Sequence, residues 1–322
     1  MNYPDLPYGK VMCILQLQNA SDIVAEATML KPAGLLLGWK LFQPDFHFFF
    51  PLFYFFLFLP FLLFAMRVTV LNDEKPGICP AEHGISFLIE GGAKILFDVG
   101  PSDIFARNAA TLGIDLEEVS AIILSHGHWD HTNGLKYIKG KKLVCHPDCF
   151  AKRFWKNDKE YNGVPITLEE AKKQFQLVLT TKPYKLGEDI LFLGEIPRLN
   201  GFEAKTTEFY LEGGADDFIL GDSALAIKTG KGLAVIAGCS HAGICNIVEY
   251  AKKASGVGNV YAVIGGFHLL ENNESARRTI EYFQKEKIAA VYPSHCVSEA
   301  VIEEMGKSLN VIRIRSGDVI DI

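Results

Sequence analysis

The feature of this sequence that most constrains its fold is a run of metal-ligand residues directly after an apolar segment. Residues 119–124 (VSAIIL) are apolar and partly β-branched, which predicts a buried strand. Residues 132–135 (TNGL) are turn and cap types that predict the start of a helix. The heptapeptide between them, SHGHWDH, contains four side chains of metal-ligand type: His126, His128, Asp130 and His131. The sequence therefore predicts a metal site on a strand-to-helix loop, where a rigid scaffold commonly presents chemistry.

The spacing of these ligands favours two metal ions over one. His126 and His128 are two residues apart, so their side chains can point the same way from an extended segment. Asp130 and His131 are adjacent and must diverge, so the four cannot easily close a single tetrahedral site. Paired ions about 3.5–4 Å apart suit hydrolysis and phosphoryl or diphosphate chemistry. The alternative is a surface loop that happens to be rich in histidine. It does not explain why four residues of metal-ligand type occur within six positions directly after a buried strand.

Three later segments repeat the arrangement of a strand followed by a loop histidine. Residues 233–237, 260–264 and 289–292 are apolar and predict strands. Each is followed within a few residues by one histidine: His241, His268 and His295. Histidines at the carboxyl ends of several strands can meet at one edge of a sheet. A structural role is the better interpretation for any one of them, but not for all three together.

Composition and charge exclude some classes of function. The chain has 322 residues, 49% of them hydrophobic and 22% charged, which suits a globular protein with a sizeable core. A formal net charge of −6 argues against a dedicated nucleic-acid-binding protein. The seven cysteines are scattered and odd in number, so they predict no disulfide framework and favour a reducing, cytoplasmic location.

The first 66 residues have a different character from the rest. Residues 1–45 contain four prolines and no sustained periodicity. Residues 46–66 carry no charged side chain and are long enough to cross a bilayer as a helix, although Pro51 and Pro60 fall inside them. Two interpretations stand: a genuine membrane anchor, or a mis-assigned translation start with the natural beginning at Met66. The second is favoured, because nothing upstream of Met66 connects to the chemistry.

The heptapeptide resembles the metal-binding motif of the metallo-β-lactamase superfamily. The resemblance implies an α/β fold, a four-layer αβ/βα sandwich, over residues 67–322. It implies two divalent metal ions, with zinc favoured and manganese, iron, cobalt or magnesium as alternatives. It also makes Asp98, in the Asp-Val-Gly turn that ends a strand pair, a residue that orients a ligand. The metal ligands expected from the motif and the later loops are His126, His128, Asp130, His131, His241 and His295.

Further segments resemble one branch of that superfamily, which includes 7,8-dihydropterin-6-methyl-4-(β-D-ribofuranosyl)aminobenzene 5′-phosphate synthase of methanopterin biosynthesis. The segments are EHGIS at 82–86, GEIPR at 194–198, GCSH at 238–241, GGFHL at 265–269 and SHC at 294–296. One departure concerns the aspartate that bridges the two metals in the superfamily. Here the corresponding Gly238-Cys239 carries cysteine, which leaves the bridging ligand open, with Asp222 and His268 as substitutes.

The resemblance implies a transferase that joins a dihydropterin methyl diphosphate to a ribofuranosylaminobenzene phosphate and releases diphosphate. Asp130 and His268 are the expected catalytic residues. His83, Arg198 and Arg153 are the expected contacts to a small phosphorylated substrate.

Each of these substrate contacts has a structural alternative. His83 could cap a strand, Arg198 could pair with Glu195 or Glu203, and Arg153 could belong to a solvated helix face. A metal-dependent hydrolase of a phosphodiester, lactone or thioester is the second reading of the whole chain. A metal-holding protein without turnover is the third. No nucleic-acid partner is expected, and the membrane is a partner only if residues 46–66 are an anchor.

Overall fold

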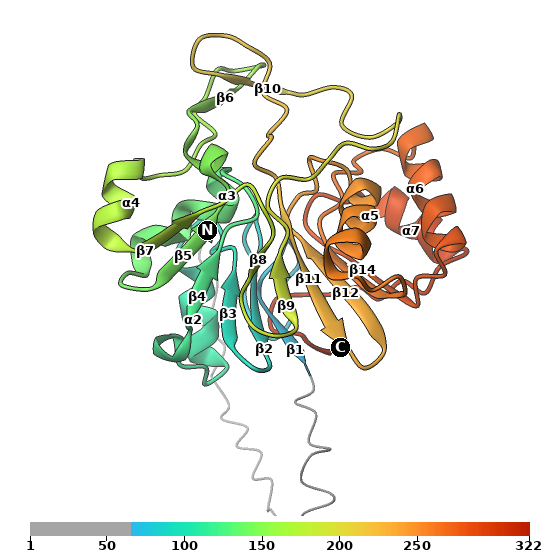
Figure 1. Cartoon of the computed structure of the whole chain (residues 1–322), viewed down its shortest axis with the longest axis horizontal. Helices are drawn as coiled ribbons and strands as arrows, with labels where there is room; N and C mark the ends of the chain where they lie inside the picture. Colours follow the sequence, from blue (N-terminus) through green and yellow to red (C-terminus); the bar gives the residue numbers. More distant parts are fainter. Residues whose placement is uncertain (1–65) are drawn as a thin grey trace, which may run out of the picture. The chain divides into compact units, whose positions relative to one another are not determined.

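The structure is a computed structural model that describes residues 66–322, and two β-sheets form its centre (Figure 1). The first sheet has seven strands in the spatial order β15-β1-β2-β3-β4-β5-β7. Its pairs β3–β4, β4–β5 and β5–β7 are parallel, and the others are antiparallel. The bounds of these strands are Val319–Asp321 (β15), Arg67–Asn72 (β1), Ser86–Glu90 (β2), Lys94–Phe97 (β3), Ala121–Ile123 (β4), Lys142–Cys145 (β5) and Gln176–Leu179 (β7).

The second sheet has six strands in the order β14-β13-β12-β11-β9-β8. The pairs β12–β13 and β13–β14 are parallel, so these three strands end at the same edge. The bounds are Ala290–Pro293 (β14), Val260–Gly265 (β13), Gly232–Ala237 (β12), Ala224–Thr229 (β11), Ile190–Phe192 (β9) and Tyr184–Lys185 (β8).

The two sheets pack face to face through apolar side chains that alternate along their strands. Val68, Phe87 and Phe97 from the first sheet share one buried cluster with Leu225 and Ile264 from the second. Alternate residues of the same strands face outward into separate clusters beneath the helices. Strands that are apolar on both faces are typical of a sheet covered on both sides.

Helices cover the outer face of each sheet. The first sheet is covered by α2 (Ile104–Thr111) and α4 (Leu168–Gln174), and the second by α5 (Ile244–Ser255), α6 (Glu274–Lys285) and α7 (Glu299–Gly306) (Figure 1). Short 3₁₀ turns occupy Leu116–Glu118, Asn133–Tyr137 and Pro147–Phe150. The layers therefore run helix, sheet, sheet, helix, which confirms the predicted sandwich.

A small two-stranded arm lies outside the two sheets, on the side of the molecule where the candidate metal ligands lie. It consists of β6 (Arg153–Trp155) paired antiparallel with β10 (Phe209–Leu211) (Figure 1). The expected helix face around Arg153 is therefore wrong, because these residues form a strand. Residues 168–179 supply α4 and β7, so they belong to the first sheet and to the helical layer that covers it. The side chains of β7 are exposed or half-buried at the sheet edge.

No helix within residues 66–322 is both long and apolar enough to cross a membrane. The hydrophobic stretch at 46–66, on which the anchor interpretation depends, lies outside the described residues except for Met66.

Candidate metal centre

The candidate ligands lie on loops that follow β4, β12, β13 and β14, the strands that the sequence predicted. The heptapeptide begins in the loop after β4, and its last three residues form most of the one-turn helix α3 (Trp129–Thr132), which begins earlier than the sequence predicted. Gly127, between the first two histidines, has no room for a side chain. A Cβ there would lie 2.2 Å from the Cys149 carbonyl oxygen and 2.7 Å from a guanidinium nitrogen of Arg153. Close packing on this glycine therefore holds the heptapeptide in place.

Three histidines form the first cluster. The ring nitrogens of His126, His128 and His241 lie within 4.8 Å of one another. Burial holds the pKa of all three imidazoles well below the usual value, so they are neutral. His126 Nε2 and His128 Nδ1 lie 3.0 Å apart, within hydrogen-bond distance. The Nε2 atoms of His128 and His241 are buried and have no hydrogen-bond partner in the described part of the chain. Buried polar atoms without partners are rare in native proteins, and a divalent cation would satisfy both.

A second cluster adjoins the first. The Oδ2 atom of Asp130 lies 3.5 Å from His131 Nε2 and 3.1 Å from His295 Nε2. Burial opposes ionisation of Asp130, but the neighbouring charges of His131 and the hydrogen bond from His295 outweigh it. The pKa of this carboxyl is therefore held well below its usual value. An ionised carboxylate with two imidazoles is a donor set that suits zinc, iron, manganese or cobalt.

The structure thus brings together all six residues that the sequence nominated as ligands and divides them into two triads. We call His126, His128 and His241 the first triad, and Asp130, His131 and His295 the second triad. The rings of His126 and His131, one from each triad, have centroids 4.3 Å apart. Two neighbouring ions would fit this donor set.

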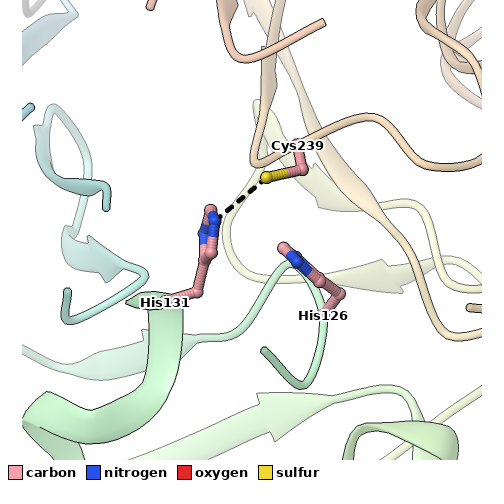
Figure 2. Close-up of side chains that lie close together, drawn as sticks. All are labelled: His126, His131 and Cys239. Carbon is pink, nitrogen blue, oxygen red and sulfur yellow. Dashed lines mark hydrogen bonds between the residues drawn. The ribbon is translucent and has the colours of Figure 1, made fainter. Parts of the chain in front are cut away.

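Cys239 lies between the two triads, whereas Asp222 and His268 belong to no ligand cluster among the described residues. The Sγ atom of Cys239 is 3.1 Å from His131 Nε2 (Figure 2). The carboxylate of Asp222 instead accepts a hydrogen bond from the Ala242 amide, at 2.8 Å. His268 packs beside His241, with ring centroids 4.5 Å apart.

Asp98 supports the second triad from beneath. Its carboxylate lies 2.8 Å from His131 Nδ1 and accepts hydrogen bonds from the Ser125 amide and hydroxyl, at 2.7 and 2.6 Å. It is fully buried. This is the geometry expected of a carboxylate that fixes the tautomer and orientation of a metal-binding histidine.

The backbone around the site is strained at four positions. Asp98, Ser240, His268 and His295 have φ values of 54°, 62°, 49° and 50°. These values lie in the left-handed region, which residues other than glycine rarely adopt. Such residues cluster at functional sites, where the surrounding structure holds them.

Two acidic residues at the end of β1 belong to the site, although the sequence analysis did not nominate them. Glu74 Oε1 lies 2.7 Å from His295 Nδ1 and 2.8 Å from His83 Nδ1. Burial opposes its ionisation, but the hydrogen bonds from these two imidazoles outweigh it and lower its pKa to about 2. Asp73 accepts hydrogen bonds from the His295 amide and the Ser294 hydroxyl. The signal that could have found them is an acidic pair directly after a strand.

The residues expected to contact substrate are placed differently from one another. His83 is exposed beside the second triad, with Nε2 3.5 Å from Asp130 Oδ2. Arg153 is fully buried and pairs with Asp217 and Asp148, both at 2.8 Å. Arg198 is half-buried, and its guanidinium donates to the carbonyl oxygens of Phe218 and Ile219.

A cavity of about 390 Å³ opens beside the first triad. His241 and His268 form part of its wall. The remaining wall includes four phenylalanines, one lysine and three glutamates: Phe202, Phe209, Phe218, Phe267, Lys205, Glu203, Glu208 and Glu271. The cavity combines aromatic surface, a cation and the candidate metal ligands, as small-molecule sites commonly do.

Comparison with known proteins agrees with this geometry. The sequence model of the metallo-β-lactamase superfamily matches residues 81–147. The chain is 37% identical over 240 residues to 7,8-dihydropterin-6-methyl-4-(β-D-ribofuranosyl)-aminobenzene-5′-phosphate synthase of Methanocaldococcus jannaschii, covering 67% of this chain and 81% of the relative. The chain belongs to the metallo-β-lactamase superfamily. It is also 33% identical over 250 residues to an uncharacterized protein of the same organism, covering 75% of this chain and 94% of that protein.

Solved structures of the metallo-β-lactamase superfamily show the same fold. The crystal structure of a metal-dependent hydrolase of the β-lactamase superfamily has a TM-score of 0.72 and 28% identity, covering 80% of this chain and 99% of that one. The metallo-β-lactamase fold protein YhfI from Bacillus subtilis has a TM-score of 0.51 and 15% identity, covering 80% and 99%. Metallo-β-lactamase proteins usually bind divalent metals, and the names of the family and of these relatives indicate an enzyme.

Proposed function

We propose that this chain is a metal-dependent transferase. It would join 6-hydroxymethyl-7,8-dihydropterin diphosphate to 4-(β-D-ribofuranosyl)aminobenzene 5′-phosphate with release of diphosphate. The 37% identity to the 7,8-dihydropterin-6-methyl-4-(β-D-ribofuranosyl)-aminobenzene-5′-phosphate synthase of Methanocaldococcus jannaschii supports this substrate class. The observation that carries the proposal is the aromatic cavity with Lys205 beside the first triad, because a flat pterin or aryl ring with a phosphate needs both surfaces.

The two triads would hold a pair of divalent ions, and Asp98 and Glu74 would orient His131 and His295 toward them. When bound, such ions supply Lewis-acid stabilisation of the negative charge that develops on a leaving diphosphate.

The proposed coupling reaction releases a proton, and His268 would accept it. The aryl amine nitrogen would form a bond to the pterin methylene carbon while the carbon–oxygen bond to diphosphate breaks. The electron pair of that bond leaves with diphosphate, and the nitrogen loses a proton. His268 forms part of the cavity wall and would take up this proton. Asp130 would act as a metal ligand rather than as the base, because His131 and His295 already engage its carboxylate.

The cation available to a substrate phosphate is Lys205 rather than the two nominated arginines. Lys205 is exposed and lines the cavity. It makes no ion pair within residues 66–322, so its ammonium group is available. Arg153 is buried between two carboxylates, and Arg198 is engaged by backbone carbonyl groups. A Lys205→Ala variant should raise the KM for phosphorylated substrates. Substitution of Arg153 should instead lower the free energy of unfolding.

The test is an assay of the purified full chain, loaded with zinc or manganese, with both proposed substrates. We expect stoichiometric release of diphosphate and formation of the coupled product only when both are present. In the Lys205→Ala variant, loss of a charge-assisted hydrogen bond worth about 1.5–3 kcal/mol should lower kcat/KM roughly 10- to 100-fold with the metal content unchanged. Lys231→Ala, which removes an exposed lysine in the turn between β11 and β12, serves as the matched control.

One observation favours a second function, a metal-dependent hydrolase. The solved structure at 28% identity is described as a metal-dependent hydrolase. Assays with a panel of phosphodiesters, lactones and thioesters distinguish the two. Turnover of one of these, together with no product from the pterin and aryl substrates, would replace the transferase by the hydrolase.

A further inference from the structure

Cys239 occupies a position that two close-packed loops fix. It follows β12 in the loop that also carries His241, and it is 4% exposed. Gly238, just before it, packs on the heptapeptide loop. A Cβ at Gly238 would lie 2.1 Å from the Ser125 hydroxyl oxygen, and one at Gly266 would lie 2.5 Å from the Gly238 carbonyl oxygen. The loop after β12 therefore has little freedom, and the thiol has a defined place.

That place is between the two triads. The Sγ atom of Cys239 is 3.1 Å from His131 Nε2, which belongs to the second triad. It also lies within 4.8 Å of the ring nitrogen of His126, which belongs to the first. Figure 2 shows the thiol directed toward the ring of His131, with the His126 ring alongside. A ligand atom in this position can contact both ions of a pair.

Other buried atoms point to a cation at the same place. The unpartnered Nε2 atoms of His128 and His241 belong to the triad that includes His126. Asp222, the oxygen ligand that the sequence offered as a substitute, accepts a hydrogen bond from the Ala242 amide through Oδ2. Its buried Oδ1 has no hydrogen-bond partner within residues 66–322, but Asp222 joins no ligand cluster there. No carboxylate of the described residues joins Cys239 in its cluster with His126 and His131. The ligand atom that lies between the triads is therefore the sulfur of Cys239.

We propose that Cys239 is a thiolate ligand shared by the two metal ions, and that it makes the centre select thiophilic ions such as zinc over magnesium and manganese. This inference rests on the metal centre of the proposed function. On binding, the thiol loses its proton to solvent, and sulfur–metal bonds take the place of the S–H bond. Thiolate ligands favour zinc and related ions, whereas oxygen ligands suit magnesium and manganese.

Cys296 is the competing sulfur ligand. Its Sγ accepts a hydrogen bond from the His268 amide, at 3.3 Å, and donates to the Cys239 carbonyl oxygen, at 3.5 Å. These contacts turn it toward the backbone of the loops. It clusters with Cys239 and His295 but not with the first triad. It therefore reaches one side of the centre at most, and a variant at this position separates the two thiols.

The test is X-ray absorption spectroscopy of the full chain loaded with zinc, alongside elemental analysis. We expect two zinc ions per chain and a sulfur shell at about 2.3 Å. Cys239→Ser should remove the sulfur shell and weaken zinc binding by about 10- to 100-fold or more. Changes to residues that support metal ligands already cost that much. Cys296→Ser and Cys245→Ser, the latter at a buried position of α5, should keep the shell.

Cys239→Asp tests the selectivity. It restores a bridging oxygen, so two ions should bind again, without sulfur and with the preference moved toward manganese. A wild-type chain that binds zinc without a sulfur shell would overturn the inference, whatever the variants do. Loss of the shell in Cys296→Ser alone would transfer the role to that residue. A wild-type chain that binds no metal would instead overturn the metal centre of the proposed function.

Discussion

At the scale of single residues, the second triad depends on a carboxylate that is not a ligand. Asp98 holds His131 through Nδ1 and ties the loop to β3 through Ser125. Its φ of 54° lies in the region that asparagine tolerates better than most residues. Asp98→Asn therefore keeps the backbone and the shape while it removes the negative charge.

We expect Asp98→Asn to weaken metal binding about 10- to 100-fold, the usual cost of changing a residue that orients a ligand. Competition with a chelator, followed by elemental analysis, measures the effect. His146→Asn is the matched control, because His146 is also buried but belongs to no ligand cluster of residues 66–322. Equal metal affinity in wild type and Asp98→Asn would contradict this role.

At the scale of elements, the start of β11 supports the loop between β12 and α5. Asp222 is fully buried and accepts a hydrogen bond from Ala242, the residue after His241. Burial raises the pKa of its carboxyl from 3.8 to about 7. A carboxyl with a raised pKa binds its proton more tightly in the folded state. Its contribution to stability is therefore complete below pH 3.8 and is lost as the pH rises to about 7.

We expect the free energy of unfolding of the metal-free full chain to fall more steeply across this pH window in wild type than in Asp222→Asn. Each unit of pKa shift corresponds to about 1.4 kcal/mol. Urea unfolding followed by circular dichroism, at a series of pH values, measures the slopes. Asp158→Asn, on an exposed loop, should leave the wild-type slope intact. Parallel slopes in wild type and Asp222→Asn would show that Asp222 does not titrate there.

The arm formed by β6 and β10 depends on a buried cation. Arg153 pairs with Asp217 and Asp148, and its guanidinium lies against Gly127 of the heptapeptide loop. Arg153→Met leaves two carboxylates without their partner, which should lower the free energy of unfolding by about 3–5 kcal/mol. Lys152→Met removes an exposed ion pair next to it and should have little effect. Chemical denaturation measures the free energy of unfolding of both variants. Equal stability of the two would contradict the stabilising role of Arg153.

At the scale of the whole molecule, every residue of the proposed centre lies within 66–322. The carbonyl group of Met66 accepts a hydrogen bond from the amide of the last residue, Ile322, at 2.8 Å, so β1 is joined to the end of the chain. A fragment starting at Met66 should bind as much metal as the full chain and have the same activity per mole. Elemental analysis and the coupled assay test this. A fragment that aggregates, beside a full chain that is stable and active in detergent, would support the anchor interpretation.

The sequence by itself determined the fold class, and it nominated the candidate ligand residues. The heptapeptide after a buried strand is a local pattern, and its chemistry follows from residue types a few positions apart. The same holds for the loop histidines after β12, β13 and β14, because a run of apolar residues that ends in a polar loop can be read along the chain.

Only the tertiary structure decided how these residues group. His241 joins His126 and His128 because β12 and β4, in different sheets, end at the same rim once the two apolar faces pack together. The same packing brings Glu74 from the end of β1 to His295. It also buries Arg153 and places Cys239 between the triads. Contacts between side chains far apart in the sequence depend on strand order and sheet packing, which no local pattern of residues encodes.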